Sequence, residues 1–181
     1  MRYLLIDHIT EWKPGEFIKG VKNVAMSEDF LEFHFPKNPI MPGVMLLEAL
    51  AQLSGWLEAA SSDFKNWFLI SNVRKSNFYS FALPGDQVEL EVQVLPPRPP
   101  VVKGGKEGDA PPTPSPLERG AGVCNRGEVK VYRGIGTVKG KKKIVAEFEG
   151  EVVPIAEIED AEEQRRFFRI LTREIKISLS V

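Results

Sequence analysis

The segment Gly43–Ala60 constrains the fold of this chain more than any other part of its sequence. It consists largely of helix-forming residues, contains no proline, and is apolar on almost every side of the helix that it would form. A helix that is apolar all round is a buried helix, because any exposed face would place those side chains in water. We therefore expect a single long helix with a sheet wrapped around it.

The rest of the chain supplies the strands of that sheet. Alternation of apolar and polar residues, interrupted by turns rich in Gly and Pro, is typical of half-buried strands. Strands are predicted over Arg2–Ile9, Glu16–Ala25, Asn66–Tyr79, Gln87–Leu95, Glu128–Val138 and Lys143–Pro154. A second helix is predicted over Ala156–Leu171, because its early acidic residues and late arginines complement the helix dipole. Together these elements indicate the α+β class.

A proline- and glycine-rich segment, 96–122, interrupts the predicted strands. It holds 8 of the 14 prolines of the chain and has no apolar periodicity, so it cannot contribute to a core. Because strand-like sequence lies on both sides of it, we interpret it as a flexible loop inserted between two strands of one sheet. The predicted organisation is a single domain over 1–154, followed by a C-terminal helical extension and tail over 155–181.

The composition argues against several classes of protein. The net charge is −1 at pH 7, with 24 Lys and Arg against 25 Asp and Glu, so a nucleic-acid partner held by bulk charge is not expected. A single cysteine, Cys124, and two histidines exclude an internal disulfide and leave little material for a metal site. No apolar run is long enough to span a membrane, and the first residues do not resemble a signal peptide. We expect a cytoplasmic protein without membrane contact.

The predicted helix contains two polar residues that share a face, Glu48 and Gln52, four positions apart. Burial would raise the pKa of the Glu48 carboxyl, which is the property that a general acid needs at neutral pH. Two other interpretations remain open, in which Glu48 lies on an exposed stripe or at a contact between subunits. Glu58 lies near the end of the helix, where we expect it to be solvated.

A histidine lies just before this helix, between Phe33 and Phe35. Desolvation by the two phenylalanines would favour the neutral imidazole of His34, which is the form that a general base needs. The alternative is a hydrogen-bonded histidine of the core. The step from Pro42 to Gly43 opens the helix, so its first backbone N–H groups and the positive end of its dipole could hold a developing oxyanion there.

These residues belong to one continuous motif. It reads His34-Phe35-Pro36-x-x-Pro39-Ile40-Met41-Pro42-Gly43-Val44-x-x-x-Glu48-Ala49-x-Ala51-Gln52-x-x-Gly55. The motif resembles the signature of the 3-hydroxyacyl-acyl-carrier-protein dehydratases, which are hotdog-fold enzymes of fatty acid synthesis. The resemblance covers residues 3–95 continuously and 123–154 more loosely. It implies a hotdog fold, in which an antiparallel sheet wraps around one long buried helix.

The resemblance also implies roles for individual residues. His34 matches the histidine that removes or relays the C2 proton, and Glu48 matches the acid that protonates the departing C3 hydroxyl. The amide of Gly43 matches the donor that holds the thioester carbonyl, and Gln52 matches a residue that supports the site. Phe35 and Val44 lie inside the same motif, and we assign them to substrate binding together with Gly43 and Gln52.

The reaction and the partners follow from the same resemblance. A 3-hydroxyacyl thioester would lose water to give a trans-2-enoyl thioester, without metal or redox cofactor. The substrate would arrive on the phosphopantetheine arm of an acyl carrier protein or of coenzyme A. The family works as a homodimer in which His34 of one subunit would face Glu48 of the other, and dimers could assemble further.

The chain resembles a divergent member of the family, with an insertion at 96–122 and a C-terminal extension, and two further departures bear on function. Phe33 stands where the family usually has glycine before the histidine, and only Arg74 and Lys75 supply positive charge near 76–81, where basic residues are expected. Two rival functions therefore remain. One is a hotdog thioesterase, in which Glu48 would activate water at the thioester carbonyl. The other is a non-catalytic hotdog protein that binds acyl chains.

Overall fold

The computed structural model describes residues 4–35, 37–96 and 128–173. Its strands are β1 (His8–Lys13), β2 (Phe17–Asn23), β3 (Asn66–Phe78), β4 (Gln87–Leu95), β5 (Val129–Val138) and β6 (Lys141–Pro154). Its helices are α1 (Asp29–Phe33), α2 (Gly43–Ser61), the 3-10 turn η1 (Ile155–Glu157) and α3 (Ala161–Leu171). The strands form one sheet in the order β1-β2-β4-β5-β6-β3, and every neighbouring pair is antiparallel.

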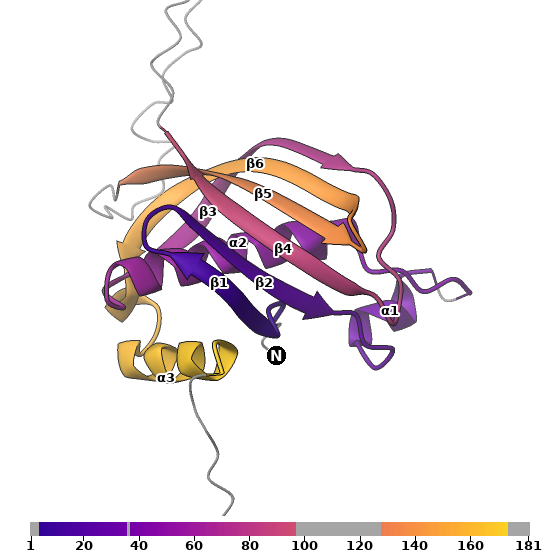
Figure 1. The fold of residues 1–181 in the computed structure, drawn as a ribbon, viewed down its shortest axis with the longest axis horizontal. Coiled ribbons are helices and arrows are strands. Elements are labelled where there is room, and N and C mark those ends of the chain that lie inside the picture. Colours follow the sequence, from indigo (N-terminus) through magenta and orange to yellow (C-terminus); the bar gives the residue numbers. More distant parts are fainter. Residues whose placement is uncertain (1–3, 36, 97–127, 174–181) are drawn as a thin grey trace, which may run out of the picture.

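The sheet curves around α2, which runs along its inner face (Figure 1). The leucines at 46, 50, 53 and 57 of this helix are almost completely buried. A Cβ atom at Gly134 on β5 would lie only 2.7 Å from Cδ1 of Leu50, so the missing side chain allows α2 to pack closely on the sheet. The α+β architecture with one long central helix is therefore confirmed, because the apolar pattern of the helix could be satisfied only in this way.

Helix α3 packs against the C-terminal end of α2. Asp160 caps it by accepting a hydrogen bond from the backbone N–H of Glu163. Its buried Phe168 meets Trp12 of β1 edge-on, with ring centroids 5.5 Å apart, and also contacts Trp56 of α2. Because Phe168 belongs to the main hydrophobic cluster, α3 extends the core around α2. The division of the chain at residue 154 stays a prediction.

Two predicted elements are wrong in position. The first strand was expected over Arg2–Ile9, but β1 is His8–Lys13. Leu5 is buried, as its apolar character requires, but its backbone N–H donates to a side chain of α2 and not to a strand. The helix expected over Ala156–Leu171 is divided, because η1 ends before the capping residue of α3.

The proline-rich segment predicted as a flexible loop, 96–122, lies outside the described residues except for its first residue. Cys124 and the tail from residue 174 onward also lie outside them. On either side of the segment, β4 and β5 are neighbours in the sheet, with Leu95 opposite Val131.

Candidate active site

His34 lies at the end of α1 and is half-buried. Its Nδ1 atom lies 2.8 Å from the backbone oxygen of Ile40, which is itself in the core. Because a carbonyl oxygen can only accept a hydrogen bond, Nδ1 must carry the proton. In the neutral imidazole, Nε2 is then the basic nitrogen, and the ring is fixed in the tautomer that a general base needs.

The imidazole lines a hollow of about 630 Å³ together with the first turn of α2. Aromatic side chains from the end of β3 and the segment after it complete the wall, namely Phe78, Tyr79 and Phe81. Phe35 also lines the hollow, and its backbone has a φ of 61°, which is unusual for a bulky residue. This conformation holds the Phe35 ring edge-on to His34, with centroids 4.8 Å apart. Phe33, by contrast, is largely exposed and does not line the hollow.

The N-terminus of α2 opens into the same hollow. Pro42 precedes the helix, and its carbonyl accepts the N–H of Met45, so the N–H groups of Gly43 and Val44 precede the first turn of helical hydrogen bonds. A Cβ atom at Gly43 would lie 2.8 Å from the Phe78 ring, so only glycine allows this close approach. The corner therefore presents two backbone donors and the positive end of a helix dipole.

Glu48 lies one turn further along α2 and is exposed. Gln52 donates from Nε2 to Glu48 Oε1 at 3.0 Å, and its own Oε1 accepts the N–H of Leu5 at 3.0 Å. Within one chain Glu48 is not desolvated, so of the interpretations above the structure favours an exposed stripe or a subunit contact. The carboxylate lines a second hollow, of about 240 Å³, between α2 and β3.

His34 and Glu48 therefore line two different hollows, which share Val44 as a common wall. Among the described residues no hydrogen bond or ion pair joins the two side chains. The candidate residues Gly43, Val44 and Phe35 lie on the side of His34, and Gln52 lies on the side of Glu48.

Comparison with known proteins identifies the family. A family model described as the FabA-like domain matches residues 1–103, which is more than half of the chain. The chain belongs to the FabA-like family. The match spans His34, Glu48 and every other candidate residue, so the resemblance that the motif indicates is confirmed.

Curated relatives of this FabA-like chain are 3-hydroxyacyl-acyl-carrier-protein dehydratases named FabZ. The protein of Nitratidesulfovibrio vulgaris Miyazaki F is 46% identical over 96 residues, which cover 51% of this chain and 62% of the relative. The protein of Thioalkalivibrio sulfidiphilus is 37% identical over 100 residues, which cover 51% and 67%. The chain therefore spans less than two thirds of the first relative's length and 67% of the second's.

Solved structures support the fold. A hot-dog-like protein from Thermanaerovibrio acidaminovorans superposes with a TM-score of 0.52 and 16% identity, covering 86% of this chain and 91% of that one. The dehydratase heterocomplex ApeI:P from Xenorhabdus doucetiae gives a TM-score of 0.51 and 12% identity, covering 83% and 99%. At these identities the likeness concerns the fold alone, and it confirms the predicted hotdog fold of the FabA-like chain.

The prediction that Glu58 is solvated is wrong. Only 2% of this residue is exposed, and its Oε2 lies 2.7 Å from Nζ of Lys130 on β5. The hydroxyl of Tyr132 donates to Oε1 of Glu58, and burial together with this carboxylate raises the pKa of Tyr132. Lys130 and Tyr132 are two residues apart on a strand and so share one face, but nothing in the helix pattern indicates that this face meets Glu58.

In residues 4–35, 37–96 and 128–173, no group of three or more His, Cys, Asp and Glu side chains is placed to hold a metal ion. In the same part of the chain, no helix has the length and apolar character needed to cross a membrane.

Proposed function

We propose that this chain is a dehydratase that converts a 3-hydroxyacyl thioester to a trans-2-enoyl thioester and, in reverse, hydrates the enoyl thioester. The observation that carries the proposal is the hydrogen bond from His34 Nδ1 to the Ile40 oxygen. Because Nδ1 carries the proton, Nε2 is the basic nitrogen of His34. The His34 ring lines an apolar hollow beside the N-terminus of α2. The relatives named FabZ are 3-hydroxyacyl-acyl-carrier-protein dehydratases, which adds independent support.

The proposed reaction uses both ends of the site. Nε2 of neutral His34 removes the C2 proton, and the electron pair moves toward the thioester oxygen. The N–H groups of Gly43 and Val44 stabilise the charge on that oxygen. The electron pair then returns to form the C2–C3 double bond, while Glu48 gives its proton to the C3 hydroxyl, which leaves as water. The reaction is redox-neutral and uses proton transfers alone, so the proposal includes no metal and no redox cofactor.

Gln52 has a positioning role in this scheme. It is held by the N–H of Leu5 at one end and donates to Glu48 at the other. The carboxylate therefore keeps one oxygen bound while the other is available to the C3 hydroxyl.

We further propose that the working site is shared between the subunits of a homodimer. His34 and Glu48 line different hollows in one chain, and β3 is an edge strand of the sheet among the described residues. The edge exposes Leu69 and Val73, and the adjoining turn of α2 exposes Val44. A two-fold axis at this edge would bury these side chains, desolvate Glu48 and bring it to the partner's His34. Assembly beyond the dimer remains a prediction.

An acyl carrier protein is the proposed donor of the substrate. The turn between β5 and β6 and the first residues of β6 carry exposed lysines at 139, 141 and 142. Lys143 donates to the Phe81 oxygen at the wall of the His34 hollow. The backbone N–H of Tyr79 also donates to the Lys143 oxygen at 2.9 Å. These lysines supply, from a distant part of the sequence, the positive charge that was expected near 76–81. An acidic carrier protein fits this surface, and the proposed location is the cytoplasm.

The first test is a spectroscopic assay of enoyl-thioester hydration, with substrates of several chain lengths on both acyl carrier protein and coenzyme A. Release of free thiol without hydration would support the thioesterase instead, and binding without turnover would support an acyl-binding protein. Triple replacement of Lys139, Lys141 and Lys142 by glutamate should raise KM for the carrier-bound substrate and not for an N-acetylcysteamine thioester. An equal effect on both substrates would contradict carrier docking at this turn.

The shared site is tested by complementation. Chains with His34→Ala and chains with Glu48→Gln are both expected to be inactive. After subunit exchange, half of the dimers are mixed and each has one intact site, so about a quarter of the wild-type activity should return. If exchange is demonstrated by mass spectrometry and no activity returns, each site is built from a single chain.

A further inference from the structure

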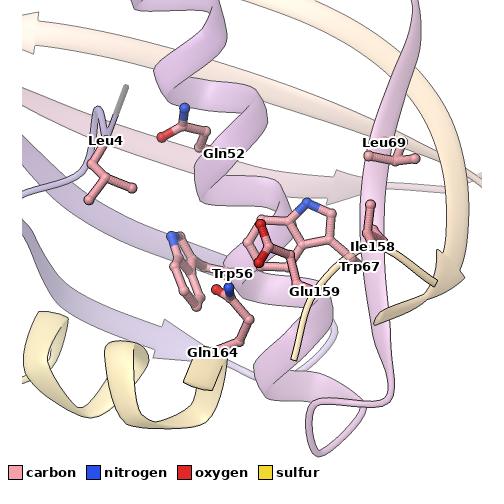
Figure 2. Close-up of a pocket in the computed structure, with 8 residues that line it drawn as sticks. All are labelled: Leu4, Gln52, Trp56, Trp67, Leu69, Ile158, Glu159 and Gln164. Carbon is pink, nitrogen blue, oxygen red and sulfur yellow. The ribbon is translucent and has the colours of Figure 1, made fainter. Parts of the chain in front are cut away.

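A third hollow, of about 210 Å³, lies where α2, β3 and α3 meet, and we call it the tryptophan pocket. Figure 2 shows its two indole rings, Trp56 from α2 and Trp67 from β3. Their centroids are 5.0 Å apart and the rings are nearly perpendicular. Leu4, Leu69 and Ile158 add aliphatic surface, and Gln52, Glu159 and Gln164 add polar groups.

Gln164 is the unusual member of this pocket. It extends from α3 toward the indoles (Figure 2), and only 2% of the residue is exposed. Its Oε1 atom is buried and has no hydrogen-bond partner among the residues that the structure describes. Buried acceptors are almost always satisfied, and leaving one unpaired costs free energy. This oxygen is therefore positioned for a donor from outside the chain.

The tryptophan pocket is connected to the candidate active site through Gln52. That side chain lines the pocket and also donates to Glu48. Trp56 is eight residues beyond Glu48 on the same helix, a rise of about 12 Å at 1.5 Å per residue. A fully extended chain advances about 1.2 Å per bond, so about ten bonds separate a carbon at Glu48 from the pocket.

Two residues close the far end of the pocket: Gly55, the last residue of the motif, and Gln164, which lies outside it. A Cβ atom at Gly55 would lie 2.5 Å from the Trp67 ring, so glycine at this position allows the indole to rest directly on α2. Gln164 lies beyond residue 103, where the match to the FabA-like domain ends. The polar end of the pocket is therefore a property of this chain's own C-terminal helix.

We propose that the tryptophan pocket binds the far end of the acyl chain of the substrate, and that it selects chains whose end carries a hydrogen-bond donor, a hydroxyl or an amide N–H. The proposal rests on the dehydratase function above, because that function places C3 of the substrate at Glu48. The indoles and Leu69 contact the methylenes, and the terminal donor pairs with Gln164 Oε1. A chain that ends in a methyl group would bury the same oxygen without a partner.

The test measures binding and does not depend on turnover. Dodecanoyl pantetheine and omega-hydroxydodecanoyl pantetheine are titrated into the full chain by calorimetry. The wild type should bind the hydroxylated thioester about five- to tenfold more tightly, the range expected for one buried hydrogen bond. Gln164→Leu should remove this preference and leave the urea midpoint unchanged or higher, because the variant deletes an unpaired acceptor.

A second variant tests the position of the pocket. Ile158→Trp fills it, so the ratio of hydration rates for twelve-carbon and four-carbon enoyl thioesters should fall at least about tenfold. Ile170→Trp is the matched control, since Ile170 is similarly exposed on α3 and does not line the pocket. The control should keep the wild-type ratio.

Three results would overturn the proposal. The first is equal affinity of the wild type for the two pantetheine thioesters. The second is a preference that survives Gln164→Leu, and the third is a lower urea midpoint in that variant, which would make Gln164 a structural residue. If the wild type shows the preference in calorimetry but hydrates no enoyl thioester, the dehydratase proposal fails and the pocket stands as a binding site.

Discussion

Replacing Glu58 by glutamine tests whether the buried carboxylate of α2 holds the fold together. The substitution keeps the shape of the side chain and removes its charge. The amide oxygen can still accept the Tyr132 hydroxyl, but the new NH₂ group faces the ammonium of Lys130, where Oε2 now lies 2.7 Å away. Two hydrogen-bond donors, the amide NH₂ and the Lys130 ammonium, then face each other, and Lys130 loses its negatively charged partner.

The magnitude follows from the burial of the two partners. Removing one partner of a fully buried ion pair costs about 3–5 kcal/mol. The Lys130 side chain is 24% exposed and can regain some water. We therefore expect Glu58→Gln to lower the free energy of unfolding by about 2–3 kcal/mol. For a chain of this size, the melting temperature should fall by about 4–12 °C, at about 2–4 °C per kcal/mol.

The same substitution at Glu48 is the control. Glu48 lies on the same helix and is exposed within one chain, and in the proposed dimer it acts as an uncharged acid. Glu48→Gln therefore breaks no ion pair and should change the free energy of unfolding by no more than about 0.5 kcal/mol. If Glu48 is the general acid, hydration activity should fall by about 10²–10⁴-fold in this variant. Glu58→Gln should keep its activity at temperatures where it is folded. One substitution at two positions therefore separates stability from catalysis.

The assay is urea unfolding at 25 °C, followed by tryptophan fluorescence and by circular dichroism. The double variant with Glu58→Gln and Lys130→Met should recover part of the loss, because no unpaired charge remains. A loss below about 0.5 kcal/mol in Glu58→Gln would refute the reasoning, since a partnered buried charge would then contribute nothing. A double variant that is less stable than the sum of the two single changes would refute the charge argument in particular.

Two further predictions concern β3 and its neighbours. A hydrogen bond from Asn72 and the Arg74 guanidinium lower the pKa of Glu149 below 4.5, so its stabilisation is present above about pH 4.5 and is lost as the pH falls through the lowered pKa. The free energies of unfolding of wild type and Glu149→Gln, measured by urea titration, should thus differ by about 0.5–1 kcal/mol at pH 7 and become equal in acid. A difference that stays constant with pH would contradict this role of Glu149. Gly55→Ala should destabilise the chain by about 1–2 kcal/mol and shift the tryptophan emission, because its Cβ meets Trp67; an unchanged spectrum would contradict that contact.

The central helix and the His34 corner could be predicted from the sequence because both depend on local information. The apolar pattern of Gly43–Ala60 can avoid water only if the helix is buried. The helix α2 ends within one residue of the prediction. The prolines that punctuate the corner before α2 fix the backbone without help from distant residues. The structure then adds the Ile40 oxygen as the partner of His34, six residues away.

The burial of the two glutamates could not be predicted in the same way. Glu48 and Glu58 are both carboxylates in an apolar helix, and the helix pattern alone does not distinguish them. What decides is β5, more than seventy residues further on, which brings Lys130 and Tyr132 to Glu58. The proposal that the lysines at 139–143 dock a carrier protein depends on the same kind of long-range contact, because only the sheet brings this hairpin beside Phe81.

In the proposed dimer, the α2 helices of both subunits contribute to one site. Gly43 of the subunit that supplies His34 would hold the carbonyl, and Glu48 of the partner subunit would protonate the C3 hydroxyl. From Glu48 the acyl chain would run along that second helix, past Gln52 to Trp56, at about 5.4 Å per turn. Substitutions near the N-terminus of α2 should therefore slow every substrate alike, whereas substitutions near Trp56 should act only on substrates long enough to reach it. This gradient follows because α2 serves in each subunit as both the core of the fold and a wall of the site.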